Sequence, residues 1–528
     1  MRILFLSIVG LLFMGCKKEI PVKDFAQQKP KTIVRKMPKT GKILSIDTTL
    51  YGKFESPVLV DFYAKFNNET VWQSEDDRKI ILNEFSNAEN EGLNPDDYRI
   101  KKLLTFEKRF QELSDKELID YDLLLTYNLQ KYIWHISQGK INPKSLYSDW
   151  DLPEKNTDVN QILAHAFEKD VLQTTIDSCK PQHIVYKKLK NALQIINTFP
   201  KDTLKKIVFD GKIIPNDTSK ALINIKKRLI YWKDLEPQDS LTRIYDTKTI
   251  NAIKRFQERH GLADDGVIGQ GTLKALNYTK QDRKHQIIAN LERWKWFPKN
   301  LGDEYIIVNI PEYKLRLVEN NDTIRKHKVI VGTSKRKTPI LTSKLSYTVF
   351  NPTWTVPPTI LKEDVIPATK KNWNYLESKN ITVYDNSGNK ISSSQWNAAK
   401  AMSYRYVQSP GSYNSLGMVK IMFPNRFSVY LHDTNHRDYF VKSNRSLSSG
   451  CVRVDEPLEL TATLLNDSIS YNLEKIGEIL KTGETKNVKF NKEILLHQWY
   501  WTAWSRENLL IFRDDIYNLD QELYNKLK

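Results

Sequence analysis

Two hydrophobic periodicities divide the chain. Between residues 56 and 205, apolar residues recur at the three- and four-residue spacing that is typical of amphipathic helices. Within this range, residues 182–199 form a separate segment with the same period. Ser114 and Glu117 have the spacing of a capping box, which places a helix start between these two residues. The pattern predicts a helical scaffold domain over 56–205, in which no catalytic motif is visible.

A second, smaller helical unit is expected over 212–278. Its central segment reads TINAIKRFQERHGLADDGVIGQGTLKAL. An apolar stripe that includes Phe256 marks one helix, which Gly261 ends. The glycines between 265 and 269 favour a tight loop, and Thr272 lies at the start of the next helix. Most of these residues shape the turns, so no binding contact is assigned to any of them individually.

From residue 305 the period changes to two, which indicates strands. The segments that alternate in this way are 305–310, 314–318, 327–331, 344–350 and 418–423. They predict a β-rich domain over 304–480. Residues 359–408 interrupt it with helical and polar sequence, as a lid over a site would, although a surface decoration gives the same pattern. Residues 481–528 are expected to form a C-terminal extension that packs on this domain. The predicted fold class is multidomain α+β.

The first segment predicts the compartment. Residues 1–16 read MRILFLSIVGLLFMGC, in which one arginine precedes an apolar run too short to span a bilayer. The run suits the core of a signal peptide and ends in Gly15 and Cys16. This ending resembles the lipidation site of bacterial lipoproteins, so Cys16 is expected to carry a lipid. An uncleaved anchor or plain signal peptide is the alternative. Residues 17–55 then read as a flexible basic tether.

Composition narrows the function classes. The 528 residues contain 81 Lys and Arg against 63 Asp and Glu, a formal charge of +18. Such a balance suits an anionic partner, whether nucleic acid, a membrane surface or an acidic polymer. The three cysteines exclude a disulfide scaffold and a four-cysteine zinc module. One of them, Cys179, lies inside the scaffold helices and is interpreted as an inert buried thiol.

The candidate chemistry lies between residues 428 and 454. His432 alternates with apolar neighbours and should end a strand, and Cys451 follows nineteen residues later in SSGCVRV. A cysteine nucleophile needs a nearby base and donors for an oxyanion. Gly450 gives backbone N–H groups room to face a carbonyl oxygen, and Arg453 places positive charge near the thiol. A structural thiol and a core histidine are the competing interpretation.

Family resemblance favours the catalytic interpretation. The patterns HDT and SSGCVRV, with the upstream SPGSYNSLGMVKIMFPN, resemble the active-site signature of the L,D-transpeptidases, the YkuD-type catalytic domain. The opening strand VNIP and the late segments YWTAWS and FRDDIY resemble the large periplasmic branch of that family. The segment around 245–276 resembles the peptidoglycan-binding domain type 1. The resemblance runs from about residue 56 to residue 520.

The resemblance implies a role for each residue of the motif. Cys451 matches the nucleophile and His432 the general base, and the backbone carbonyl of Asp433 is the candidate that orients the imidazole. The N–H groups of Gly450 and Cys451 would form the oxyanion hole. Arg453 matches the arginine that follows the cysteine.

Ser449 departs from the family pattern. Many members carry a second histidine directly before the glycine-cysteine pair, whereas the large branch shares the serine found in this chain. A serine hydroxyl has no near-neutral pKa and cannot shuttle protons as a histidine does. Ser449 is therefore not expected to replace the second histidine of other members.

The activity implied is 3-3 cross-linking of peptidoglycan stem peptides through a cysteinyl thioester, with release of terminal D-Ala. The same site could instead hydrolyse the thioester, exchange D-amino acids or attach a protein to the wall. A non-catalytic wall-binding scaffold is the alternative of another class.

The implied partners are peptidoglycan, carbapenem-type inhibitors and, through the lipid, a membrane; the implied location is the periplasm. No cofactor and no nucleic acid are expected. A zinc site at His432 and His436 is disfavoured, because residues four apart on a strand lie about 13 Å from each other.

Overall fold

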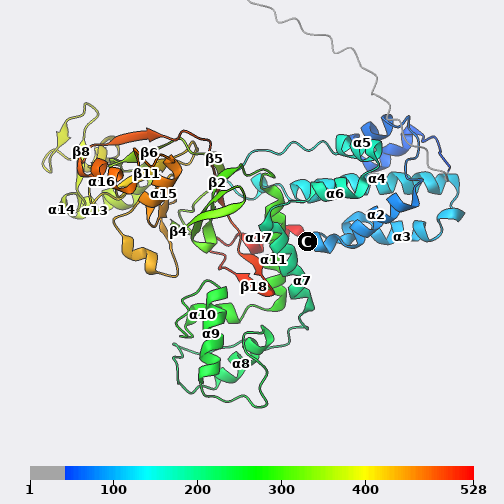
Figure 1. Cartoon of the computed structure of the whole chain (residues 1–528), viewed down its shortest axis with the longest axis horizontal. Coiled ribbons are helices and arrows are strands. Elements are labelled where there is room, and N and C mark those ends of the chain that lie inside the picture. The colour runs from blue at the N-terminus through cyan, green and yellow to red at the C-terminus, as the bar shows by residue number, and fades with distance from the viewer. Residues whose placement is uncertain (1–41) are drawn as a thin grey trace, which may run out of the picture.

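The computed structural model describes residues 42–528. The predicted signal peptide, the lipidation of Cys16 and most of the predicted tether lie outside the described residues. Within the described part, no helix combines the length and apolarity that crossing a membrane requires. Three units surround a central pair of helices, α7 (Ile184–Thr198) and α11 (Lys280–Trp296), with the scaffold and the β-rich domain at opposite ends of the long axis (Figure 1).

The scaffold is helical, as its periodicity predicts. Its helices are α1 (Pro57–Ala64), α2 (Glu75–Ser86), α3 (Ile100–Lys108), α4 (Asp115–Gln138), α5 (Val159–Lys169) and α6 (Leu172–Cys179). The capping box of Ser114 and Glu117 begins α4, the longest of them. The hydrophobic core of the scaffold ends at Cys179, which is buried. Helix α7 lies inside the predicted range of 56–205 but packs into the central core instead.

The predicted tether is too long at its C-terminal end. Residues Thr48–Phe54 form a 3-10 helix, and Ile46 and Tyr51 are buried in the scaffold core. Ser45 also forms a β-bridge with Glu69. The segment is polar enough to read as a linker, but Leu50 and Phe54 also pack against the scaffold core, so its apolar side chains are removed from water.

The second unit consists of α8 (Ala221–Tyr231), α9 (Thr247–Arg259) and α10 (Gln270–Leu276). Gly261 follows α9 with a φ of +69°, and a Cβ there would lie 2.5 Å from the Arg513 side chain. Glycine is therefore needed both for the left-handed turn and for the close approach of the C-terminal segment. Arg259 forms a buried ion pair with Asp234 and donates to the carbonyl of Leu510 at 3.0 Å. These contacts fix the unit against the C-terminal segment.

The β-rich domain is built on one long mixed sheet. Its order is β1-β5-β16-β2-β3-β4-β14-β12-β11-β6-β15, with β13 beside β4. The strands are β1 (Trp150–Asp151), β2 (Glu304–Asn309), β3 (Lys314–Glu319), β4 (Asp322–Gly332), β5 (Ile340–Lys344), β6 (Tyr347–Phe350), β11 (Val419–Met422), β12 (Leu431–His432), β13 (Ser446–Ser448), β14 (Val452–Val454), β15 (Lys486–Lys489) and β16 (Leu495–Trp499). Helices α15 (Pro457–Leu465) and α16 (Leu473–Lys481) follow β14.

The C-terminal segment is part of the sheet, which corrects the prediction of an extension that packs on a finished domain. Strand β16 lies between β5 and β2, antiparallel to the first and parallel to the second. Strands β17 (Ala503–Arg506) and β18 (Leu509–Phe512) form a hairpin, and α17 (Leu519–Leu527) follows. The sequence LLHQW of 495–499 has no apolar and polar alternation, because this strand is buried on both faces.

The predicted lid is a small folded unit. Strands β7 (Trp354–Thr355), β10 (Arg405–Gln408), β8 (Ile381–Tyr384) and β9 (Lys390–Ile391) form its sheet in that order. Helices α12 (Pro358–Ile360), α13 (Ile366–Lys371) and α14 (Asn374–Ser378) complete it, around a separate hydrophobic core. The insertion lies at the far end of the β-rich domain from the scaffold (Figure 1).

Candidate active site

Cys451 and His432 come together through the pairing of two very short strands. Strand β12 pairs in parallel with β14, so that Leu431 lies opposite Val452 and His432 opposite Arg453. Leu431 and Val452 are fully buried in the core. Because side chains alternate between the two faces of a sheet, His432, Arg453 and the flanking Cys451 project from the opposite face. The segment between them returns through β13, which pairs with β4.

The strand that ends at His432 is shorter than the sequence pattern indicates. Only Leu431 and His432 pair as β12, and Ser428 has a φ of +55°. The chain therefore bends before Tyr430, instead of running as a strand from 428 to 432.

His432 is held by the backbone of its neighbour. Its Nδ1 lies 2.5 Å from the carbonyl oxygen of Asp433, the group that the family resemblance suggests for this role. A carbonyl can only accept, so the Nδ1 carries the hydrogen and the Nε2 is left as an acceptor. Burial, followed by the charge of Arg453, lowers the pKa of His432 to about 3. The imidazole is therefore neutral near neutral pH and able to accept a proton.

The side chain of Asp433 fixes that carbonyl. Its carboxylate accepts from the backbone N–H of Met418 at 2.9 Å and from Arg437 at 2.8 Å. Gly417 packs directly against it, since a Cβ on this glycine would lie 2.4 Å from the carboxyl group. The φ of Gly417 is +62°, which also favours glycine. Asp433 thus acts through its main chain on His432 and through its side chain on the loop before β11.

Cys451 is a neutral thiol in the free protein. Burial raises the pKa of its thiol to about 11, and the opposing effects of the Tyr430 backbone N–H, the Arg453 charge and the Tyr430 hydroxyl are smaller. In the part of the chain that the structure describes, no hydrogen bond joins Cys451 to His432. Catalytic hydrogen bonds are often long in unliganded enzymes and shorten when substrate binds.

Tyr430 is a site residue that the sequence reasoning missed. Its hydroxyl lies close enough to the thiol of Cys451 and the indole of Trp354 for both to influence its pKa, which burial raises. Its ring packs edge-on to His432, with the centroids 5.6 Å apart. Tyr430 lies two residues before His432, so alternation along the chain could have indicated it. Nothing in the sequence relates it to Trp354, which begins the lid.

The loop before Cys451 is rigidly hydrogen-bonded. Gly450 has a φ of +117°, and its carbonyl accepts from the Thr338 hydroxyl at 2.8 Å. The Gly450 N–H donates to Ser448 Oγ at 3.2 Å, and that hydroxyl donates to the Cys451 carbonyl at 2.6 Å. An oxyanion role for the Gly450 N–H therefore requires this group to leave Ser448. That role stays a prediction.

Arg453 has unused hydrogen-bonding capacity. Its guanidinium reaches the Thr434 hydroxyl at 3.4 Å, and its buried Nε has no partner among the described residues. Its charge lies close enough to influence the pKa of both Cys451 and His432. A ligand carboxylate or carbonyl beside the thiol could engage it.

Comparison with known proteins gives three family matches in this chain. Residues 57–193 match the Scaffold domain, and residues 218–276 match a domain described provisionally as peptidoglycan-binding. Residues 303–473, which contain Cys451 and His432, match the L,D-transpeptidase catalytic domain of the YkuD family. Residues 303–473 therefore contain the L,D-transpeptidase catalytic domain.

A protein from Haemophilus influenzae, named provisionally as an L,D-transpeptidase, is 35% identical over 221 residues. The match covers 41% of this chain and 45% of that protein, so the chain spans about half of the relative's length. L,D-transpeptidase structures from Xylanimonas cellulosilytica and Stackebrandtia nassauensis overlay with TM-scores of 0.18 and 0.19, at 14% and 12% identity. The overlays cover 55% and 56% of this chain and 99% and 97% of those chains, and they add nothing to the family match.

In the domain that matches this family, one arginine joins the lid to the loop before Cys451. Arg336 donates to Ser449 Oγ at 3.0 Å and pairs with Glu363 and Asp364 at 2.5 and 2.7 Å. The two carboxylates lie in a π-helical turn of the lid, Leu361–Val365. The sequence places Arg336 more than 20 residues before its partners and 113 before Ser449, so no local pattern reveals the contact.

Residues 42–528 contain no group of three or more His, Cys, Asp and Glu side chains that could hold a metal ion. His436 stacks on Tyr439, with ring centroids 5.1 Å apart.

The reactivity of Cys451 is expected to follow its raised pKa. Only the thiolate reacts with iodoacetamide, so alkylation should be slow at about pH 7 and rise about tenfold per pH unit towards about pH 11. Peptide mass spectrometry against time would measure this rate at Cys451 and separate it from labelling at Cys179. A rate that is already maximal below about pH 8 would show a thiolate–imidazolium pair instead and contradict the neutral resting state.

Gly417→Ala should impair catalysis by moving Asp433. The new methyl group overlaps the Asp433 carboxyl, which shifts the carbonyl that orients His432, and a displacement of this kind costs about a hundredfold in rate. Gly483→Ala is the matched control, because Gly483 has a φ of +68° but nothing within 4 Å of the added Cβ. Acylation rates and melting temperatures of both variants would be compared. Equal acylation by both would show that the Asp433 contact does not matter.

Proposed function

We propose that the protein cross-links peptidoglycan stem peptides as an L,D-transpeptidase, through a thioester on Cys451. The observation that carries the proposal is the pairing of β12 with β14, which puts Cys451 and His432 on one face of the sheet. The hydrogen bond from His432 Nδ1 to the Asp433 carbonyl supports it, because it leaves Nε2 free as a base. The family match over 303–473 supports the reaction class.

In the first step, the Cys451 sulfur attacks the carbonyl carbon of the third stem residue of a tetrapeptide donor. The thiol proton passes to His432 and then to the amine of the terminal D-Ala. The peptide bond to D-Ala breaks, the C–S bond forms, and D-Ala leaves. No external energy source is needed, because the thioester conserves the energy of the broken amide.

In the second step, a side-chain amine of a neighbouring stem attacks the thioester carbonyl. An amide forms, the C–S bond breaks, and the amine proton returns through His432 to the sulfur. In meso-diaminopimelate walls the product is a 3-3 cross-link. Since both Cys451 and His432 are neutral at rest, proton transfer between them is coupled to attack and does not precede it.

We further propose that the lid favours an amine over water as the acceptor. Arg336 supports this, because it ties two lid carboxylates to Ser449, two residues before the nucleophile. A lid held in this way restricts access of water to the thioester. Hydrolysis or D-amino-acid exchange would use the same catalytic residues with a different acceptor.

The proposed location is the cell wall. The match of residues 218–276 to a peptidoglycan-binding domain supports it. A periplasmic position and a lipid at Cys16 are expectations from the first sixteen residues, which lie outside the described structure.

The enzyme is expected to form a covalent carbapenem adduct. Acylation of Cys451 should add the mass of the inhibitor to the intact protein, and Cys451→Ala should show no adduct. Absence of an adduct on the wild-type protein, or an equal adduct on Cys451→Ala, would contradict catalysis by Cys451 and favour a non-catalytic wall-binding scaffold.

The identity of the acceptor is tested in cells. Muropeptides from cells with and without the gene would be compared by mass spectrometry. Unchanged 3-3 dimers would contradict cross-linking.

Loosening the lid should shift the reaction towards hydrolysis. The double variant Glu363→Gln/Asp364→Asn removes both ion pairs of Arg336 but keeps its bond to Ser449. Two partly exposed pairs contribute about 1–2 kcal/mol, so the ratio of hydrolysed to cross-linked product should rise about tenfold. Lys344→Gln, which breaks the exposed pair with Glu493 in the same domain, is the control. An unchanged product ratio in the double variant would contradict this role for the lid.

A further inference from the structure

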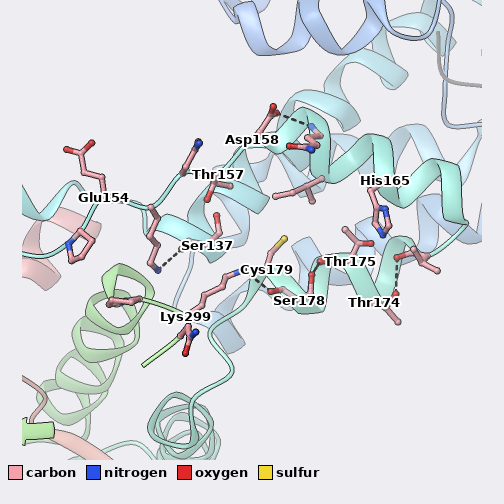
Figure 2. Close-up of a pocket in the computed structure, with 18 residues that line it drawn as sticks. Ser137, Glu154, Thr157, Asp158, His165, Thr174, Thr175, Ser178, Cys179 and Lys299 are labelled. Carbon is pink, nitrogen blue, oxygen red and sulfur yellow. Dashed lines mark hydrogen bonds between the residues drawn. The ribbon is translucent and has the colours of Figure 1, made fainter. Parts of the chain in front are cut away.

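A large cleft lies in the scaffold, away from Cys451. It has a volume of about 860 Å³ and is bounded by the end of α4, the segment 153–158, α5, α6 and residues 298–300 (Figure 2). Residues 298–300 join α11 to β2, the first strand of the catalytic domain. The cleft is therefore formed jointly by the scaffold and by the connection to the catalytic domain. Its size is that of a binding site for a small molecule or a short peptide.

Two lysines of this cleft have no carboxylate partner. Lys155 donates to the backbone carbonyls of Ser137, at 3.1 Å, and of Lys295. Lys299 donates to the carbonyl of Ser178 at 2.9 Å, and Figure 2 shows it directed towards Ser178 and Cys179. Within residues 42–528, neither lysine forms an ion pair. An ammonium group has three donors, so both lysines keep unused hydrogen-bonding capacity.

The acidic residues of the lining are already engaged. Glu154 pairs with Lys144 at 2.5 Å, outside the lysine pair. Asp158 caps α5 and accepts from the backbone N–H of Gln161 at 3.0 Å. The two lysines are thus balanced only by the carbonyls at the ends of α4, α6 and α11, which carry a partial negative charge.

The surroundings of Lys155 in this cleft disfavour its charged form. Burial, followed by the charge of Lys299, lowers the pKa of Lys155 to about 7, and no acidic group raises it. An anion between the two ammonium groups would reverse both effects by restoring solvation and neutralising the repulsion. The rest of the lining offers uncharged hydrogen-bonding side chains, among them Thr157, Gln161 and Thr174. Such groups suit the amides of a peptide.

We propose that this cleft binds a carboxylate-bearing stem peptide of the wall, with the carboxylate between Lys155 and Lys299 and the peptide amides on the neutral lining. This inference rests on the proposed function, because that function supplies the ligand. Stem peptides combine free carboxylates with amide bonds, which is the chemistry the lining matches. One protein molecule would then bind a stem peptide in this cleft while a different stem peptide reacts at Cys451.

Binding of a synthetic stem tetrapeptide to the full chain carrying Cys451→Ala would test this by isothermal titration calorimetry. Two sites are expected. In the same background, Lys299→Met should weaken one of them about tenfold, because a charge-assisted hydrogen bond is lost. Lys79→Met is the matched control, since Lys79 is an exposed scaffold lysine paired with Glu75. A tetrapeptide with amidated carboxylates should lose the same site, and inorganic phosphate should not replace the peptide.

Hydrogen exchange would place the second site. Segments 153–165 and 298–300 should become protected when the tetrapeptide binds, and this protection should be lost in Lys299→Met. Binding to one site only, unaffected by Lys299→Met, would overturn the inference and leave both lysines as caps of helix ends. A change in melting temperature without a change in binding would do the same. Failure of the proposed function is distinguishable, because it appears as an absent carbapenem adduct on Cys451 and leaves the cleft measurements unaffected.

Discussion

The parallel pairing of β12 with β14 is the constraint on which the rest of the site depends. The paired segments are only two and three residues long, so they cannot hold their register alone. The register is fixed by burial of Leu431, Val452 and Val454, since each such side chain contributes about 1.5–3 kcal/mol when removed from water. A slip of β14 by one residue would turn Cys451 towards the core and Val452 and Val454 away from it, while His432 kept its place.

The burial that fixes the strand register also determines the charge states of Cys451 and His432. The same low-polarity surroundings raise the pKa of Cys451 and lower that of His432, so both are uncharged at rest. A reactive thiolate is therefore not stored in the free protein. It forms only when a carbonyl is in place to accept the electron pair of the sulfur, which protects the thiol from other electrophiles. Asp433, held against Gly417, supplies the fixed carbonyl that makes His432 ready to take the proton.

Sequence reasoning reached the local parts of this arrangement and missed those made by distant contacts. The capping box of α4, the three helices of 212–278 and the segment that contains Cys451 are each determined by neighbouring residues, so patterns in the chain reveal them. Strand β16 was missed because it is buried on both faces and has no alternation. Arg336 and Trp354 reach the site from other elements, and no periodicity encodes such contacts.

The C-terminal segment contacts each of the elements that surround it. Strand β16 completes the catalytic sheet, whereas the β17–β18 hairpin packs against α7, and Ser505 Oγ donates to the carbonyl of Lys188 at 2.9 Å. Arg513 donates to the carbonyl of Arg259 at 3.1 Å, which ties the same segment to α9. The unit formed by α8, α9 and α10 is therefore tied to the segment that completes the sheet containing β14. Under the proposed function, a wall strand held by that unit would approach Cys451 from a restricted direction, so these contacts, as well as the residues around the thiol, would select which stem reacts.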